Sequence, residues 1–184
     1  MVQSLFNFPK RCILMTKQNQ SDLNLNIRPA TDDDLPHWQT IRAAAFAPVF
    51  ASFRELLGAE IAAITQTNDD ADQAAYLASL FAPDAGWELY TAVLDTQIVG
   101  FVSVQLNTET AVGEIGLNAV HPAAAGQGIG TALYQFALDR MQAAGMRVAT
   151  VGTGGDPSHA PARRAYEKAG FSAQIPSVYM YRLL

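Results

Sequence analysis

The chain has 184 residues, a formal net charge of −5 and 49% apolar residues. This composition excludes wholesale disorder, and an acidic chain without a basic stripe disfavours nucleic acid as a partner. A single cysteine, Cys12, excludes an internal disulfide, and three widely spaced histidines give no metal-ligand cluster, so no metal is expected. No apolar run approaches the roughly 18 residues of a membrane span. We therefore expect a single-domain cytoplasmic protein with no membrane partner.

The N-terminal residues 1–24 are predicted to be an extension, either a tail or a partly ordered segment. The charges at Lys10 and Arg11 split its apolar residues, whereas a signal peptide keeps an unbroken apolar stretch after its charges. Either Met1 or Met15 serves as the natural start in this interpretation. The remaining residues, 25–184, form one domain.

The first part of that domain is predicted to be mainly helical after one short strand. Alternation over Leu25–Arg28 predicts the strand, and Thr31 followed by three aspartates predicts a helix start, because acidic side chains favour the positive end of a helix. Pro48 is expected to interrupt this helix, which restarts over residues 52–65. A third helix is predicted over residues 69–81.

The second part changes to a two-residue period and then alternates strands with helices. Two strands joined by a short turn predict an antiparallel hairpin. In chain order, the expected strands are 88–94, 98–106, 114–120, 148–151 and 177–184, and the expected helices are 131–144 and 161–169. The chain therefore reads as an α+β domain with a mixed sheet.

A glycine-rich segment, with glycines at 126, 128 and 130, lies between a predicted strand and a predicted helix. Such glycines let the backbone approach a ligand closely, and the free N–H groups of a helix N-terminus attract phosphate. A loop that simply needs tight turns is the alternative. A Rossmann site is disfavoured because the strand 148–151 carries no acid, and a Walker loop because no lysine stands between Gly130 and Thr131.

Two stretches resemble signatures of the GNAT superfamily of acyl-CoA-dependent N-acetyltransferases. Residues 119–122 followed by 126–133 are similar to the pyrophosphate-binding motif, and residues 165–171 are similar to the second signature. The resemblance implies layered α/β/α architecture with a mixed, mostly antiparallel sheet of about seven strands that splay apart at the cofactor site. It also implies acetyl-CoA as the co-substrate.

The resemblance implies a set of cofactor contacts around the glycine loop. These residues are Ala119, Val120, Ala125, Gly126, Gln127, Gly128, Ile129, Gly130, Thr131 and His159. Ala125 stands where the family usually has Arg or Gln, and His159 where it has Asn. If the main-chain N–H makes the cofactor contact, Ala125 changes binding little. The imidazole of His159 still offers a hydrogen-bond donor and an acceptor.

The same resemblance implies two catalytic residues. Glu114 matches the carboxylate that acts as a base through water, with a solvated strand-end carboxylate as the alternative. Alternation predicts that its side chain shares a face with Gly116, Asn118 and Val120. Tyr166 matches the general acid that protonates the coenzyme A sulfur, with a packed core tyrosine as the alternative.

The predicted function is transfer of an acetyl group from acetyl-CoA to a primary amine in a ternary complex. The acceptor is a small-molecule or peptide amine. The net negative charge of the chain is compatible with a cationic amine but does not identify which one. A non-catalytic acyl-CoA-binding or protein-interaction domain is the alternative, and an NAD-linked enzyme is disfavoured. Because the family often forms dimers, a homodimer is left open. The short link from Phe171 to Ser177 predicts an open acceptor side.

Overall fold

The structure is a computed structural model that describes residues 24–184. The predicted extension up to residue 23, with Cys12 and both candidate start methionines, lies outside the described residues. The elements, including three short 3-10 turns labelled η, are β1 (Leu25–Pro29), η2 (Asp32–Asp34), α1 (Leu35–Thr65), α2 (Asp69–Ser79), β2 (Glu88–Leu94), β3 (Gln97–Asn107), β4 (Val112–Val120), η3 (Pro122–Ala124), α3 (Ile129–Ala143), β5 (Val148–Val151), η4 (Pro157–His159) and α4 (Ala160–Lys168).

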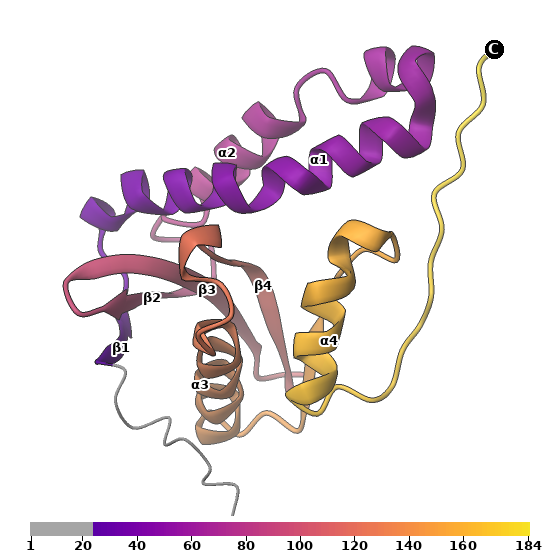
Figure 1. Cartoon of the computed structure of the whole chain (residues 1–184). Helices are drawn as coiled ribbons and strands as arrows, with labels where there is room; N and C mark the ends of the chain where they lie inside the picture. The colour runs from indigo at the N-terminus through magenta and orange to yellow at the C-terminus, as the bar shows by residue number, and fades with distance from the viewer. Residues whose placement is uncertain (1–23) are drawn as a thin grey trace, which may run out of the picture.

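One sheet runs through the described part of the chain in the order β1-β2-β3-β4-β5. All neighbours are antiparallel except β4 and β5, which are parallel. Helices α1 and α2 lie over one face, and α3 and α4 lie over the other (Figure 1). The predicted mixed, mostly antiparallel α+β fold is confirmed, although the sheet has five strands within residues 24–184 rather than about seven.

The two faces of the sheet carry separate apolar cores. On the α1/α2 face, Trp38 is fully buried, stacks on Phe101 at 4.4 Å and meets Phe81 edge-on at 5.0 Å. The core on the α3/α4 face includes Val102, Val104, Ile115, Leu133, Tyr134, Ala137, Met141 and Tyr166. Burial of these side chains holds the helices against the sheet and so fixes where the loops at the sheet's edge lie.

Helix α1 is attached to the sheet by a partly buried polar network. Asp34 accepts hydrogen bonds from Arg28 at 2.6 Å and from Thr91 at 2.9 Å, and Thr91 in turn accepts one from the Trp38 indole at 2.9 Å. The Arg28 guanidinium is the main reason that the pKa of Asp34 is lowered to about 2, with further hydrogen bonds from Thr31 and Thr91 adding to the effect. The network therefore fixes the start of α1 above β1 and β2.

The predicted helix break at Pro48 is wrong. Pro48 lies exposed inside α1, which continues through it, and the non-helical residue of this helix is Gly58, with φ 74°. The turns on both sides of Pro48 are anchored by packing, with Phe46 and Phe50 6.4 Å apart and Phe50 buried. Tertiary packing here outweighs the loss of one backbone hydrogen bond.

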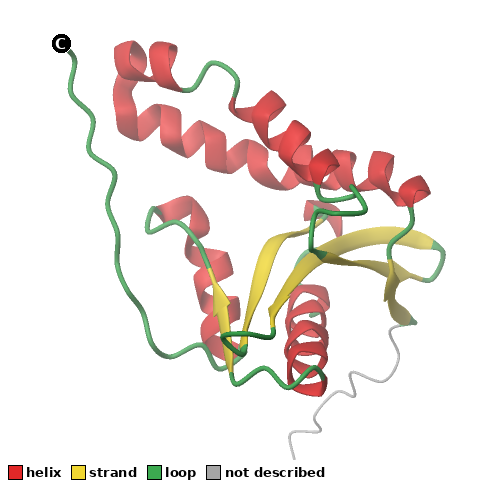
Figure 2. Cartoon of the chain, turned by 180° about the vertical axis from the view of Figure 1, so that it is seen from behind, coloured by secondary structure: helices red, strands yellow, loops and turns green. Residues whose placement is uncertain are grey.

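The predicted last strand over residues 177–184 is not formed. Residues 172–184 have no regular secondary structure and are exposed, and they run as an extended chain away from the end of α4 (Figure 2). The alternating apolar pattern of this segment suits a strand, but no strand of the described chain pairs with it.

Candidate active site

The parallel strands β4 and β5 part at a defined point. They are paired from Val112 with Val148 to Ile115 with Val151, and β4 then continues to Val120 in contact with β3 alone. The β5-facing backbone of the last five residues of β4 therefore has no partner strand among residues 24–184. This confirms the expected divergence of the two central strands.

A β-bulge in β4 lies at the same point. The β3–β4 register shifts between Val102 and Val104, and the hydroxyl of Ser103 donates to the carbonyl oxygen of Leu117 at 3.1 Å. An extra residue in one strand reverses the alternation of its side chains beyond that point. The bulge therefore changes which residues of β4 share a face.

The predicted common face for Glu114, Gly116, Asn118 and Val120 is wrong for this reason. Ile115 packs in the α3/α4 core, so its neighbour Glu114 projects from the α1/α2 face. Gly116 also faces that side, because a Cβ added there would collide with the ring of Trp87, which packs in the α1/α2 core. Val120 packs in the α3/α4 core, and Asn118 bonds to tyrosines of α3 and α4.

Glu114 is exposed and faces α2. The pKa of Tyr76 in that helix is raised mainly by the burial of Tyr76, and to a smaller extent by the negative charge of Glu114. Within residues 24–184, the Glu114 carboxylate makes no side-chain hydrogen bond or ion pair. The carboxylate is thus available to a water molecule or to a ligand on the α1/α2 side of the strand opening.

Tyr166 is buried, with 6% of its surface exposed. Its hydroxyl contacts Asn118, a residue that the sequence did not indicate as functional. The side-chain amide nitrogen of Asn118 donates to the Tyr166 hydroxyl at 3.1 Å and to the Gly116 carbonyl at 2.8 Å. The amide oxygen accepts from the Tyr134 hydroxyl at 3.0 Å and from the Tyr166 hydroxyl at 3.3 Å. Asparagine is depleted in strands, and that is the signal in the sequence that could have identified Asn118.

This arrangement fixes the Asn118 amide and gives the Tyr166 hydroxyl a donor. The amide is held at both ends, because its nitrogen bonds to Gly116 and its oxygen to Tyr134. The Tyr166 hydroxyl accepts a hydrogen bond from the Asn118 amide nitrogen and donates a longer one to the amide oxygen, so its proton must leave that longer bond to be donated elsewhere. Burial and the neighbouring Tyr166 raise the pKa of Tyr134, which therefore stays protonated as a donor to Asn118.

The glycine loop leads into α3 with a row of free donors. Gly128 is the N-cap residue, with φ 82° and ψ 0°, a left-handed conformation that glycine adopts without strain. Among the described residues, the backbone N–H groups of 126–131 have no backbone acceptor, and the first bond of the helix runs from Ala132 to Gly128 at 3.0 Å. Free N–H groups at the N-terminus of a fifteen-residue helix form an anion-binding surface.

The other predicted cofactor-binding residues near the glycine loop differ in burial and in whether their backbone N–H is free to bind a ligand. Ala119 packs in the α1/α2 core and is 9% exposed, and Val120 packs on the opposite face. The N–H of Ala125 already donates to the Pro122 carbonyl at 3.1 Å. Gln127 and Thr131 are exposed, whereas Ile129 is buried.

His159 has its contacts outside the glycine loop. Its Nδ1 lies 2.5 Å from Asp156, and its ring stacks on Phe53 of α1 with centroids 5.8 Å apart. Burial raises the pKa of Asp156, but hydrogen bonds from Ser158 and His159 outweigh it and lower this pKa to about 2. Asp156 also accepts from Ser52 of α1 at 3.3 Å. The structure therefore joins His159 to α1, and does not bring it into contact with residues 126–131.

Two further features bear on the class of protein. Among residues 24–184, no group of three or more histidine, cysteine, aspartate or glutamate side chains is placed to hold a metal ion. No helix in the same range is long and apolar enough to cross a membrane.

A mixed sheet whose parallel pair diverges beside a glycine loop with free N–H groups defines an α+β domain suited to a phosphate-bearing ligand. The chain belongs to the acetyltransferase (GNAT) family, whose model matches residues 51–171. It is 34% identical over 160 residues to a mycothiol acetyltransferase of Sanguibacter keddieii, which is 84% of this chain and 45% of that protein. The chain thus spans less than half the length of that relative.

Solved structures share the fold. An acetyltransferase of the GNAT family from Desulfovibrio desulfuricans is 20% identical with a TM-score of 0.64, over 82% of this chain and 87% of that one. A GNAT acetyltransferase from Brucella melitensis, solved in complex with acetyl-CoA, is 23% identical with a TM-score of 0.55, over 81% and 83% of the two chains. At these identities the likeness shows the fold alone.

Proposed function

We propose that this chain transfers the acetyl group of acetyl-CoA directly to a primary amine in a ternary complex. The observation that carries the proposal is the Tyr166 hydroxyl, which accepts a hydrogen bond from Asn118 at 3.1 Å beside the point where β4 leaves β5. Membership of the GNAT family supplies the reaction class. The glycine loop, at the end of the same strand, supplies a place for the coenzyme's phosphates.

The residues of the glycine loop fit the pyrophosphate of acetyl-CoA. The N–H groups of residues 126–131 have no backbone acceptor within the described chain, so they are available to a bound anion. A Cβ added at Gly130 would meet only Val120, at 3.8 Å, so the space above this glycine is open to a ligand. Acetyl-CoA, when bound, supplies an acetyl group activated as a thioester.

Two side chains of this chain are proposed to move protons. The amine must lose a proton as its nitrogen forms the C–N bond, and the Glu114 carboxylate, exposed on the α1/α2 face, takes that proton through a water molecule. The C–S bond then breaks, and the Tyr166 hydroxyl donates its proton to the departing sulfur. Asn118 is a positioning residue, because its amide nitrogen donates to the Tyr166 oxygen at 3.1 Å and its amide oxygen accepts from the Tyr166 hydroxyl at 3.3 Å, a longer bond that the proton leaves on transfer to the sulfur.

The acceptor is proposed to be a small-molecule or peptide amine that lies on the α1/α2 side. Glu114 faces this side, and the net charge of −5 favours cationic amines. The Sanguibacter keddieii relative is named for mycothiol acetylation. That name supports acetyl transfer by this chain without identifying its acceptor, because the chain covers 45% of that protein.

The experiment that tests this function is coenzyme A release from acetyl-CoA with a panel of amines: a polyamine, an aminoglycoside and a lysine-containing peptide. We expect at least one amine to release free thiol together with an acetylated product of matching mass. Tyr166→Phe and Glu114→Gln should each lower turnover by about 10²-fold or more. Tyr90→Phe, which removes a hydroxyl bonded to Glu88 on β2, is the matched control and should keep wild-type turnover.

Acetyl-CoA binding without acetylated product from any amine would instead support a non-catalytic acyl-CoA-binding domain. Wild-type turnover in Tyr166→Phe would exclude this tyrosine as the acid.

A further inference from the structure

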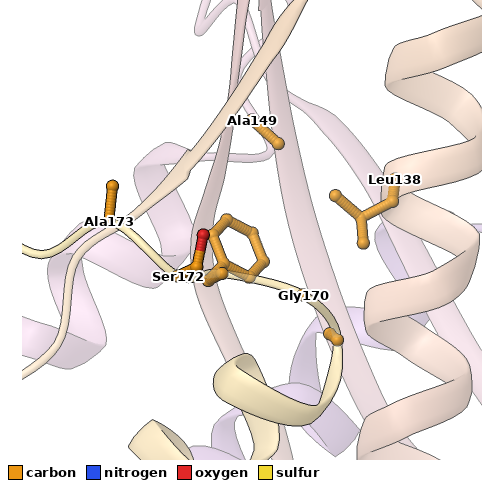
Figure 3. Close-up of a pocket in the computed structure, with 7 residues that line it drawn as sticks. Leu138, Ala149, Gly170, Ser172 and Ala173 are labelled. Atoms are coloured by element: carbon orange, nitrogen blue, oxygen red, sulfur yellow. The ribbon is translucent and has the colours of Figure 1, made fainter.

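A row of three polar side chains crosses the α1/α2 face of the sheet where the pairing of β4 with β5 ends. Glu114 is the cross-strand partner of Gln105 on β3 and of Thr150 on β5. Val104 packs in the α3/α4 core, so the next residue, Gln105, points to the opposite face, as Glu114 does. Ala149 lines a pocket of about 280 Å³ beside α3 (Figure 3), so the next residue, Thr150, also points to the α1/α2 face.

This polar row is available to a ligand. Within residues 24–184, the side chains of Gln105, Glu114 and Thr150 make no hydrogen bond or ion pair. Glu114 and Thr150 are exposed, and Gln105 is half-buried. A ligand on the row would therefore find one carboxylate, one amide and one hydroxyl without displacing a protein partner.

Trp87 borders the row at the point where the strands part. Its ring lies against Gly116 so closely that a Cβ on that glycine would collide with it. Gly116 is the first residue of β4 beyond the last pair with β5, and it lies two residues, about 7 Å, from Glu114 on the same face. Trp87 also lines a pocket of about 390 Å³ with Leu80 and Phe81, so its indole is not packed on all sides and can shift to admit a ligand.

Tyr76 of α2 is the second aromatic side chain beside Glu114. It is 46% exposed, and the Glu114 carboxylate is near enough for its charge to act on the Tyr76 hydroxyl. An aromatic ring attracts an organic cation to its face and covers the carbon atoms attached to the charge. Tyr76 and Trp87 therefore give the surface around Glu114 an affinity for ammonium groups that carry apolar substituents.

We propose that Tyr76 and Trp87, together with Glu114, recognise the acceptor and select a primary amine carried on an apolar carbon skeleton over a polyhydroxylated amino sugar. The inference rests on the proposed acetyl transfer, because it identifies the acceptor of that reaction. The ammonium lies beside Glu114, and the two aromatic rings cover the adjacent carbon atoms. A hydroxyl-rich skeleton would lose its hydrogen bonds to water against these rings, with only Gln105 and Thr150 to replace them.

The first test measures recognition without turnover, by nuclear magnetic resonance of the ¹⁵N-labelled full chain. The probes are choline, a cation that has no primary amine, and its neutral isostere 3,3-dimethylbutan-1-ol, each titrated in the absence of acetyl-CoA. The chain has two tryptophans, and Trp38 is an internal reference because it is fully buried and its indole bonds to Thr91. We expect choline to shift the Trp87 indole signal saturably and to bind about tenfold more tightly than the isostere.

Two variants show whether the aromatic ring and the carboxylate are responsible. Tyr76→Leu and Glu114→Gln should each weaken choline binding about threefold or more. Tyr181→Leu replaces a tyrosine of matched exposure, 47% against 46%, and should bind choline as the wild type does. Equal affinity for the two probes, an unmoved Trp87 signal, or wild-type binding in Tyr76→Leu overturns the proposal.

The second test compares acceptors in the acetyl transfer itself. We expect kcat/KM to be at least about tenfold higher for pentylamine than for glucosamine. Tyr76→Leu and Trp87→Leu should reduce this preference by raising KM for pentylamine, with KM for acetyl-CoA unchanged, and Trp87→Phe should keep most of it because a ring remains. A preference for glucosamine, or a preference that survives both leucine variants, overturns the proposal.

The two tests separate failure of this inference from failure of the proposed function. Selective choline binding that depends on Tyr76 and Glu114, in a chain that acetylates no amine, would support the recognition site and contradict the acetyl transfer. Turnover of amines by a chain that does not distinguish choline from its isostere would support the acetyl transfer and overturn the recognition site.

Discussion

At Asn118, a single amide links two tyrosines, so its replacement should affect turnover more than cofactor binding. Asn118→Ala removes both hydrogen bonds between this side chain and the Tyr166 hydroxyl, and Asn118→Asp replaces the amide donor with a second acceptor for the Tyr166 proton. We expect kcat to fall about tenfold or more in both variants, with KM for acetyl-CoA within about twofold of wild type. Steady-state kinetics measure both constants, and an effect confined to KM would show that Asn118 does not act through Tyr166.

Asp34 should make the stability of the fold sensitive to acid. Its folded pKa of about 2 lies below the ordinary value of 3.8, so the unfolded chain binds more protons in this range, and stability falls as the pH drops from about 4 toward 2. Asp34→Asn lacks this contribution. We expect the variant to be about 1–2 kcal/mol less stable at pH 7, after allowing for the 36% exposure of Arg28.

Urea unfolding of both proteins at several pH values checks this prediction. The gap between wild type and Asp34→Asn should narrow from pH 4 to pH 2. A gap that stays constant would contradict the role given to the Arg28–Asp34 pair.

At the scale of elements, a substitution in the glycine loop should weaken acetyl-CoA binding without lowering the stability of the fold. A Cβ at Gly130 meets only Val120, at an ordinary 3.8 Å, so Gly130→Ala should leave the melting temperature within about 2 °C of wild type. The same Cβ would occupy space assigned to acetyl-CoA, so its Kd should rise about tenfold or more. Titration calorimetry measures the Kd, with Gly155→Ala as control, because a Cβ there meets no atom within 4 Å. Unchanged affinity in Gly130→Ala would place the coenzyme elsewhere.

Most elements could be predicted from the sequence because their signals are local. The strands 88–94 and 148–151 match β2 and β5 residue for residue, since a two-residue period and nearby turn residues mark them. The predicted break at Pro48 is wrong and the non-helical residue of α1 is Gly58, because a proline in the sequence does not reveal the packing that continues the helix past residue 48. The strand predicted over 177–184 lacks a partner in the described chain, and pairing is a non-local property.

The candidate site residues remain predictions, and the geometry around them could not be predicted from the sequence. Glu114 and Tyr166 could be selected by resemblance, but the bulge opposite Ser103 puts Glu114 on the face opposite Asn118. A one-residue insertion in a ladder leaves no mark in the alternation of apolar and polar residues along β4. His159 remains a predicted coenzyme contact, and its contacts with Asp156 and with Phe53 of α1 depend on tertiary packing that has no local signal in the sequence.

For the whole molecule, the proposed acetyl transfer requires that acetyl-CoA binds the folded domain specifically. Its most direct test is thermal unfolding of the full chain with acetyl-CoA and, separately, with NAD, each at about a hundred times a plausible Kd. Specific binding at that ratio adds about 2.7 kcal/mol to the free energy of unfolding, or roughly 5–10 °C for a domain of this size. We predict that shift with acetyl-CoA and none with NAD. No shift with acetyl-CoA would contradict the coenzyme site and, with it, the proposed acetyl transfer.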